Sequence, residues 1–153
     1  MTESDTVKKM FMKYLGIDFG VRKIGLASGD DETGLAFPMG NIDGGVKAIS
    51  TIMNRARDEG AEALVIGLPI PDVHQSETQL DLTKQFVRDV QAATPMPVFV
   101  VDEQFTSAEA RRLQAEYGGD MPEDAWAAKI ILQAFLDGDV ELTVDDAKRR
   151  EEE

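Results

Sequence analysis

The chain has 153 residues, of which 29 are acidic and 16 are lysine or arginine, so its formal net charge is −13. This length allows one domain with a sizeable core, and a sequence without cysteine excludes disulfides and thiolate metal sites. No apolar run is long enough for a membrane span or a signal sequence. We therefore expect a soluble cytoplasmic protein that has no membrane partner and that repels polyanions at long range.

Three short apolar segments near the N-terminus predict strands joined by tight turns, and hence an antiparallel meander. These segments are residues 14–19, 24–28 and 35–39. Asp18 interrupts the first of them, although a strand rarely places Asp at a central position without a chemical reason. The turn that follows brings Arg22 and Lys23 close to this carboxylate, so the segment could hold a metal ion and a phosphate. An Asp that merely starts a turn is the simpler alternative.

The sequence then alternates between helices and strands. Residues 63–68 form a continuous apolar run that is typical of a buried strand, and a helix is predicted on either side of it. The first helix follows Asp43 as its cap, ends at Gly60 and has an apolar face made of Val46, Ile49, Met53 and Ala56. The second helix spans residues 76–93, and its inward residues are Leu82, Phe86, Val90 and Ala93.

The next strand begins at Val98 and ends in two carboxylates, Asp102 and Glu103. Because side chains alternate along a strand, these two should point to opposite faces of the sheet, and only one of them can face Asp18. Residues 106–109 fit a capping box that starts a helix at once. Glu103 therefore lies at the carboxyl end of its strand, where open sheets place ligands.

The last predicted helix opens with Pro122 in its first turn and carries Asp124 beside an apolar stripe. The stripe consists of Ala125, Ala128, Leu132 and Phe135. Judged alone, Asp124 is better explained as a negative charge that complements the positive end of the helix dipole.

This order of elements predicts an α/β domain with a five-stranded mixed sheet and helices on both faces, because antiparallel strands come first and helix-linked strands follow. We place the domain at residues 13–137. The charged ends, residues 1–12 and 138–153, are expected to be flexible tails.

Four segments resemble, in order and spacing, the motifs of the YqgF/RuvX family of ribonuclease H-like nucleases: residues 15–30, 63–69, 98–110 and 124–135. The resemblance implies the ribonuclease H-like fold and an acidic triad of Asp18, Glu103 and Asp124. Members of this family are linked to trimming the 5′ end of precursor 16S ribosomal RNA and to cleaving Holliday junctions. The resemblance therefore implies a nuclease.

Carboxylates are hard oxygen ligands that suit Mg²⁺ or Mn²⁺, so the triad is expected to hold two such ions, with Asp18 bridging them. The candidate contacts to substrate phosphates are Arg22, Lys23, Arg111 and Arg112. For the two arginines on the predicted helix, a solvated helix face is the simpler alternative.

The predicted function is a metal-dependent nuclease acting on structured RNA, with 5′-end maturation of pre-16S ribosomal RNA as the first candidate and a ribosomal particle as a candidate partner. Cleavage of four-way DNA is an alternative. A second class is a catalytically weak binding module, favoured by the acidic charge and by residues 117–121, which lack the lysines and arginines common there in the family. A third alternative is an ATPase of the sugar-kinase and actin-like class. Such ATPases need two duplicated domains, and 153 residues suffice for only one, so this alternative ranks far below the others. The oligomeric state stays open.

Overall fold

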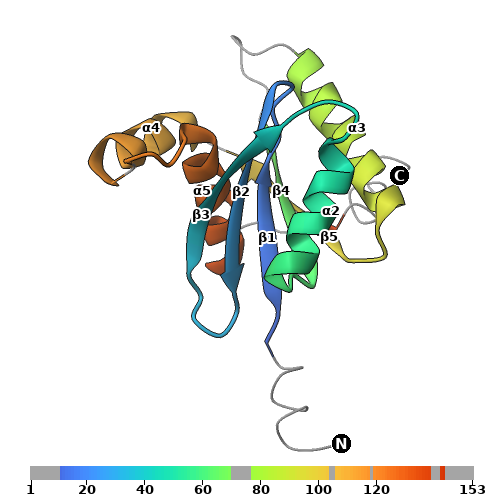
Figure 1. The fold of residues 1–153 in the computed structure, drawn as a ribbon, viewed down its shortest axis with the longest axis horizontal. Helices are drawn as coiled ribbons and strands as arrows, with labels where there is room; N and C mark the ends of the chain where they lie inside the picture. The colour runs from blue at the N-terminus through green and yellow to red at the C-terminus, as the bar shows by residue number, and fades with distance from the viewer. Residues whose placement is uncertain (1–10, 70–76, 104–105, 118, 139–141, 144–153) are drawn as a thin grey trace, which may run out of the picture.

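The structure, a computed structural model, describes residues 11–69, 77–103, 106–117, 119–138 and 142–143 (Figure 1). Its centre is one mixed sheet with the strand order β3-β2-β1-β4-β5-β6. The strands are β1 (Lys13–Asp18), β2 (Lys23–Asp30), β3 (Ala36–Asp43), β4 (Ala63–Pro69), β5 (Val98–Glu103) and β6 (Leu142–Thr143). The first three strands are antiparallel neighbours, whereas β4 and β5 run parallel to β1. The predicted five-stranded mixed sheet is therefore confirmed.

The short strand β6 adds a sixth member to this sheet. It pairs antiparallel with β5, and its register places Thr143 opposite Phe99 and Leu142 opposite Val100. These two residues belong to the segment 138–153 that we expected to be a tail, and they cover part of the exposed edge of β5. Most of that segment, like residues 1–10, lies outside the described residues.

Helices cover both faces of the sheet, as predicted (Figure 1). They are α2 (Ala48–Glu59), α3 (Glu77–Ala93), α4 (Thr106–Tyr117) and α5 (Glu123–Leu136). The first two lie on one face and α5 lies on the other, while α4 packs against α5 and extends past the sheet. None of the helices in the described segments is long and apolar enough to cross a membrane.

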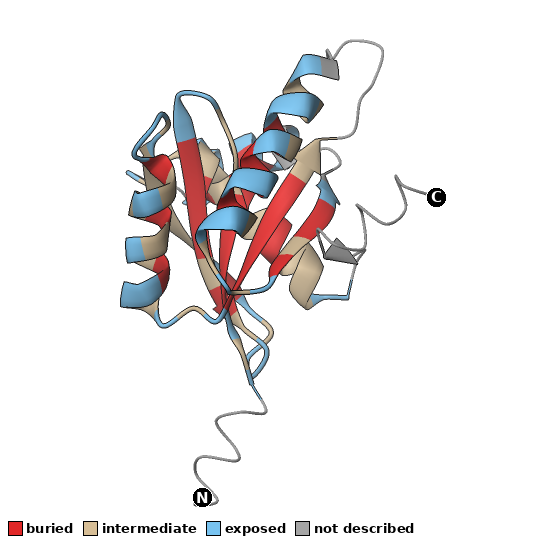
Figure 2. Cartoon of the chain, turned by 90° about the vertical axis from the view of Figure 1, so that its right-hand side faces the viewer, coloured by how far each residue is buried: buried red, intermediate tan, exposed pale blue. Residues whose placement is uncertain are grey.

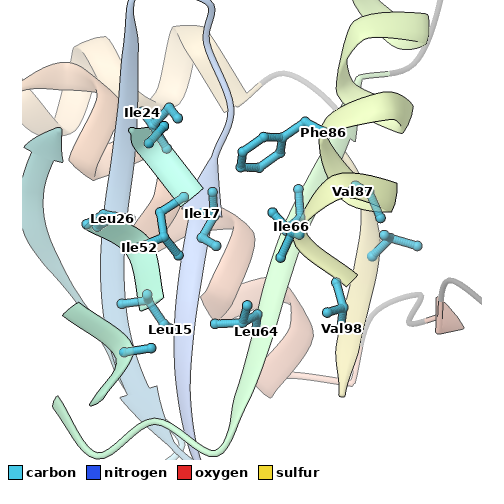
Figure 3. Packing of buried hydrophobic residues seen from close by; sticks show 14 residues of the cluster. Leu15, Ile17, Ile24, Leu26, Ile52, Leu64, Ile66, Phe86, Val87 and Val98 are labelled. Carbon is cyan, nitrogen blue, oxygen red and sulfur yellow. The ribbon is translucent and has the colours of Figure 1, made fainter. Parts of the chain in front are cut away.

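The alternation of side chains along the strands divides the core into two clusters, one on each face. Leu15 and Ile17 of β1 pack with Ile52 of α2 and Phe86 of α3 (Figure 3). Tyr14, on the opposite face of the same strand, joins the cluster that α5 covers. Figure 2 shows the buried residues concentrated on the strands and on the inner sides of the helices. Each fully buried leucine or isoleucine stabilises the fold by about 1.5–3 kcal/mol.

The apolar face that we predicted for the first helix is only partly right: Ala56 is buried and Ile49 and Met53 pack against the core, but the predicted start and Val46 are wrong. β3 continues to Asp43, which pairs with Lys23, so Asp43 is not a helix cap and α2 begins only at Ala48. Val46 precedes the helix and is fully exposed, at 102%. The buried residues of α2 are Ala48, Ile52 and Ala56. The predicted end is confirmed, because Gly60 adopts the left-handed conformation with φ 71°.

The prediction for the inward face of α3 is half right, because Phe86 and Val90 are buried as expected but the other two residues are not. Leu82 is 43% exposed and Ala93 is exposed, whereas Thr83 is almost completely buried. The Thr83 hydroxyl donates to the carbonyl of Gln79 at 2.9 Å, so burial leaves no unpaired donor. A pattern that counts threonine as polar could not identify this face.

Candidate functional site

Three paired strand positions form a row across the sheet, at the end where β1 terminates. Asp18 pairs with Gly25 of β2, and Gly25 pairs with Asn41 of β3. In β1, Tyr14 and Gly16 both face α5, since a Cβ atom on Gly16 would lie 2.8 Å from Cβ of Leu132. Asp18 follows in the same alternation and therefore belongs to the face that α5 covers.

Gly25 allows the N-terminus of α5 to approach this row. A Cβ atom at Gly25 would lie only 1.9 Å from the backbone oxygen of Asp124, so no other residue fits without a shift of the helix. The Asn41 amide Nδ2 donates to Asp124 Oδ2 at 3.2 Å. The structure thus brings Asp18 and Asp124, which are far apart in the sequence, to the same glycine.

The two carboxylates at the end of β5, Asp102 and Glu103, are successive residues and therefore belong to opposite faces of the sheet. Asp102 is exposed and alternates with Val98 and Val100, which belong to the cluster under α2 and α3. Phe99 and Val101 belong to the cluster under α5, and Glu103 is the next position of that series. The side chain of Glu103 lies outside the described part, so the structure gives only its backbone position.

The backbone position of Glu103 is compatible with a site shared with Asp18. Glu103 pairs with Pro69 of β4, and β4 separates β5 from β1. Across the sheet, two strand spacings amount to about 9–10 Å, and because Ile17 pairs with Ile66, Glu103 lies two residues, about 6–7 Å, beyond the level of Asp18 along the strands. An aspartate and a glutamate at these backbone positions could both act as ligands of one divalent cation.

The cations of the hairpin between β1 and β2 lie at the same end of the sheet. Lys23 precedes Gly25 by two residues, so it shares the face of α5, and its Nζ forms an ion pair with Asp43. The hydrogen bond from Lys23 lowers the pKa of the Asp43 carboxyl. Arg22 is exposed in the turn and has no ion-pair partner among the residues that the structure describes.

The two arginines of α4 differ in their positions. Arg111 Nη1 lies 3.9 Å from Glu123 Oε1, beside the first turn of α5 that carries Asp124. Arg112 interacts with Glu109 at 3.8 Å and with Glu116 at 3.2 Å, both on its own helix. Arg111 is therefore the one near the site, whereas Arg112 matches the alternative of a solvated helix face.

A comparison with models of protein families finds a match over most of the chain. The model described as "RuvX: Holliday junction resolvase" matches residues 12–138. The chain belongs to the RuvX family. This membership confirms the resemblance that the four sequence segments indicated, and with it the nuclease class.

Relatives in the RuvX family carry a narrower description. A protein of Roseiflexus sp. (strain RS-1) is 35% identical over 133 residues, which cover 82% of this chain and 94% of the relative. A protein of Methylobacillus flagellatus is 34% identical over 131 residues, which cover 81% and 90%. Both are provisionally named pre-16S rRNA nucleases.

Two solved structures of RuvC from Thermus thermophilus resemble the fold of this RuvX chain. One, in complex with a Holliday junction substrate, superposes with a TM-score of 0.55 at 15% identity and covers 82% of this chain and 94% of that chain. The other has a TM-score of 0.51 at 12% identity with the same coverage. At such identities the likeness shows the fold alone, and it confirms the predicted ribonuclease H-like fold.

The donor atoms of this RuvX site fit Mg²⁺ or Mn²⁺ better than Zn²⁺. Asp18 and Asp124 offer hard oxygen ligands, the chain has no cysteine, and its one histidine, His74, lies outside the described residues. Among the described side chains, which do not include that of Glu103, no group of three or more His, Cys, Asp or Glu residues could hold a metal ion. A third carboxylate ligand beside Asp18 and Asp124 is therefore not among the described side chains.

Asn41 is the residue of this site that the sequence analysis missed. We expected the third strand to end at Met39, so Asn41 was not assigned to it. Pro38 followed by Gly40 is the signal that could have found it, because proline and glycine inside a strand pattern often mark a bulge.

Proposed function

We propose that this chain is a metal-dependent nuclease whose site is formed by Asp18, Glu103 and Asp124. The observation that carries the proposal is the meeting of Asp18 and Asp124 at Gly25, at the carboxyl end of β1. Open α/β sheets bind their ligands at this edge. The position of Glu103 on the α5 side of β5 supports a third carboxylate there.

Each residue of the proposed site has a task that its position supports. The three carboxylates hold Mg²⁺ or Mn²⁺, and such ions, when bound, supply an activated water and stabilise the leaving oxygen of a phosphodiester. Arg22 and Lys23 in the hairpin, with Arg111 beside α5, contact substrate phosphates and orient the scissile strand. Arg112 takes a smaller part, because its ion pairs are with Glu109 and Glu116 of its own helix and it has none with α5 among the described residues.

The proposed substrate is structured RNA, and the proposed role is maturation of the 5′ end of pre-16S ribosomal RNA in the cytoplasm, on a ribosomal particle. The names of the RuvX relatives support this choice. Four-way DNA is the second candidate, favoured by the description of the family model and by the RuvC complex with a Holliday junction. The domain that carries the activity is residues 13–137.

The test is a cleavage assay on a precursor 16S ribosomal RNA fragment and on a four-way DNA junction, each with Mg²⁺ and with Mn²⁺. We expect cleavage of the RNA by the unaltered chain and none by Asp18→Asn. That substitution keeps the shape of the side chain but removes its charge, so it should also raise the melting temperature without metal by relieving repulsion between carboxylates.

Two variants at the end of β5 are the matched controls. Glu103→Gln should abolish cleavage, whereas Asp102→Asn should leave it nearly unchanged, because Asp102 belongs to the opposite face. Full activity of Asp18→Asn would contradict the carboxylate site. Binding of RNA without any cleavage by the unaltered chain would favour the binding module instead.

A further inference from the structure

A β-bulge in β3 decides which face of the sheet Asn41 occupies. Ala27 of β2 pairs with Pro38, but the next residue, Leu26, pairs with Gly40, so Met39 is an extra residue in β3. Gly40 has φ 105°, a conformation that residues with a side chain rarely adopt. The glycine therefore supports the irregularity at the point where the register shifts.

Without the extra residue, Asn41 would pair with Ile24, whose side chain is buried in the cluster under α2 and α3. With it, Ile42 takes that place and Asn41 pairs with Gly25. A shift of one residue moves a side chain to the other face of a sheet, and bulges redirect side chains in this way. The bulge thus brings Asn41 to the face of Asp18 and α5.

On that face, Asn41 holds one of the two carboxylate oxygens of Asp124. Its Nδ2 donates to Oδ2 at 3.2 Å, and both side chains are half-buried. Asp124 is thus anchored from β3, across the glycine that separates Asn41 from Asp18.

We propose that Asn41 is a positioning residue, whose amide orients Asp124 so that the second carboxylate oxygen binds the divalent cation next to Asp18. This inference rests on the proposed metal site. It gives a function to Asn41, which is neither an acid nor a phosphate contact, and it explains why β3 contains a bulge at this point. Partners that orient metal ligands in this way typically change metal affinity by 10- to 100-fold when they are removed.

A purely structural role for Asn41 would be to fasten β3 to α5, and the chain offers a matched control for it. Gln133 joins the same two elements farther along α5: its Nε2 donates to the Gly34 carbonyl at 2.7 Å, and its Oε1 accepts from the Ala36 amide at 3.0 Å. Gln133→Ala therefore removes fastening without touching Asp124. Asn41→Ala and Asn41→Leu both remove the donor, and the leucine keeps the volume.

The experiment measures Mn²⁺ binding to the full chain by electron paramagnetic resonance, without nucleic acid, together with melting temperatures. We expect both Asn41 variants to bind Mn²⁺ about 10-fold more weakly than the unaltered chain. Gln133→Ala should lower the melting temperature and leave Mn²⁺ affinity unchanged. In cleavage assays, the Asn41 variants should need more metal for half-maximal rate, while KM for the nucleic acid stays the same.

Two results would overturn the inference alone: unaltered Mn²⁺ affinity in both Asn41 variants, or an equal loss of affinity in Gln133→Ala. If the unaltered chain binds no Mn²⁺, the proposed metal site fails and this inference fails with it. The measurement on the unaltered chain therefore separates the two cases.

Discussion

At the residue scale, Gly25 is the position on which the geometry of the site depends. It lies between Asp18 and Asn41 in the paired strands and under the backbone of Asp124. A side chain on it cannot be accommodated by a change of rotamer, because the atom it would meet belongs to the backbone of α5. The site is therefore sensitive to one methyl group that carries no chemistry of its own.

We predict that Gly25→Ala displaces the N-terminus of α5 and lowers the free energy of unfolding by about 1–3 kcal/mol, as overpacking does. Cleavage should fall far more than this stability change explains, since Asp124 moves away from Asp18. Urea unfolding and the RNA cleavage assay measure the two effects. Ser28→Ala, on the same strand, is the control, and a fully active, stable Gly25→Ala would show that α5 does not need this close approach.

Tyr14 provides a residue-scale prediction away from the site. Its hydroxyl donates to Asp31 at 2.9 Å, and burial together with this hydrogen bond raises the pKa of Tyr14 to about 12. The folded chain thus holds the phenolic proton more tightly than the unfolded chain, whose tyrosine has a pKa near 10.0. The stabilisation is complete below pH 10 and is lost as the pH rises toward 12.

Tyr14→Phe should therefore lose less stability than the unaltered chain when the pH is raised from 9 to about 12, although it starts from a lower value. Denaturant unfolding followed at several pH values measures this difference. Because lysines titrate in the same range, only the comparison between the two proteins is informative. Parallel stability curves for the two would contradict the raised pKa.

At the element scale, the strands were predictable because their apolar runs are short and bounded by glycine or charge. The buried faces of the helices were harder to predict, as α2 shows. Ile49 and Met53 have helical spacing with Val46, which suggested a face containing all three. The residues of α2 that are fully buried are instead Ala48, Ile52 and Ala56. The pairing of β3 with β2 up to Asp43 delays the start of the helix. Such pairing between distant residues leaves no trace in local periodicity.

The corrected face of α2 predicts opposite outcomes for two aliphatic residues. Ile52→Ala should cost about 2–5 kcal/mol of unfolding free energy, because Ile52 is fully buried against the sheet. Val46→Ala should change it by less than about 0.5 kcal/mol, because Val46 is fully exposed. Thermal or urea unfolding distinguishes the two variants. If both lose a similar amount of unfolding free energy, Val46 belongs to the buried face, as the sequence pattern predicted.

The site itself shows the same limit of sequence reasoning. Asp18 could be identified as an anomaly within an apolar strand, and the alternation of Asp102 and Glu103 could be derived from strand geometry. Asn41 could not be identified from the sequence, because its position depends on one extra residue in β3 and on its contact with Asp124, 83 residues later in the chain. Local patterns identify strands, but they do not fix a register that contains a bulge.

At the scale of the whole molecule, a net charge of −13 must be reconciled with a polyanionic substrate. The cations near the site are few, and Lys23 is paired with Asp43 while Arg111 lies beside Glu123. Both pairs are exposed and hence weak, so a phosphate can compete for these cations. We expect binding through a small number of phosphate contacts, with divalent cations shielding the carboxylates.

The salt dependence of binding tests this expectation. The slope of log affinity against log salt should be shallow, about −0.7 to −0.9 for each of two to four contacts. Replacing Arg22 and Lys23 together by alanine should weaken binding of different sequences alike and flatten the slope, because backbone contacts carry no base information. Arg57 and Arg88, exposed on α2 and α3, form the control pair on the opposite face of the sheet. An unchanged slope after loss of Arg22 and Lys23 would place the phosphate contacts on α4 instead. Arg111 would then be the first candidate, because it lies 3.9 Å from Glu123, the residue before Asp124, whereas Arg112 pairs within its own helix.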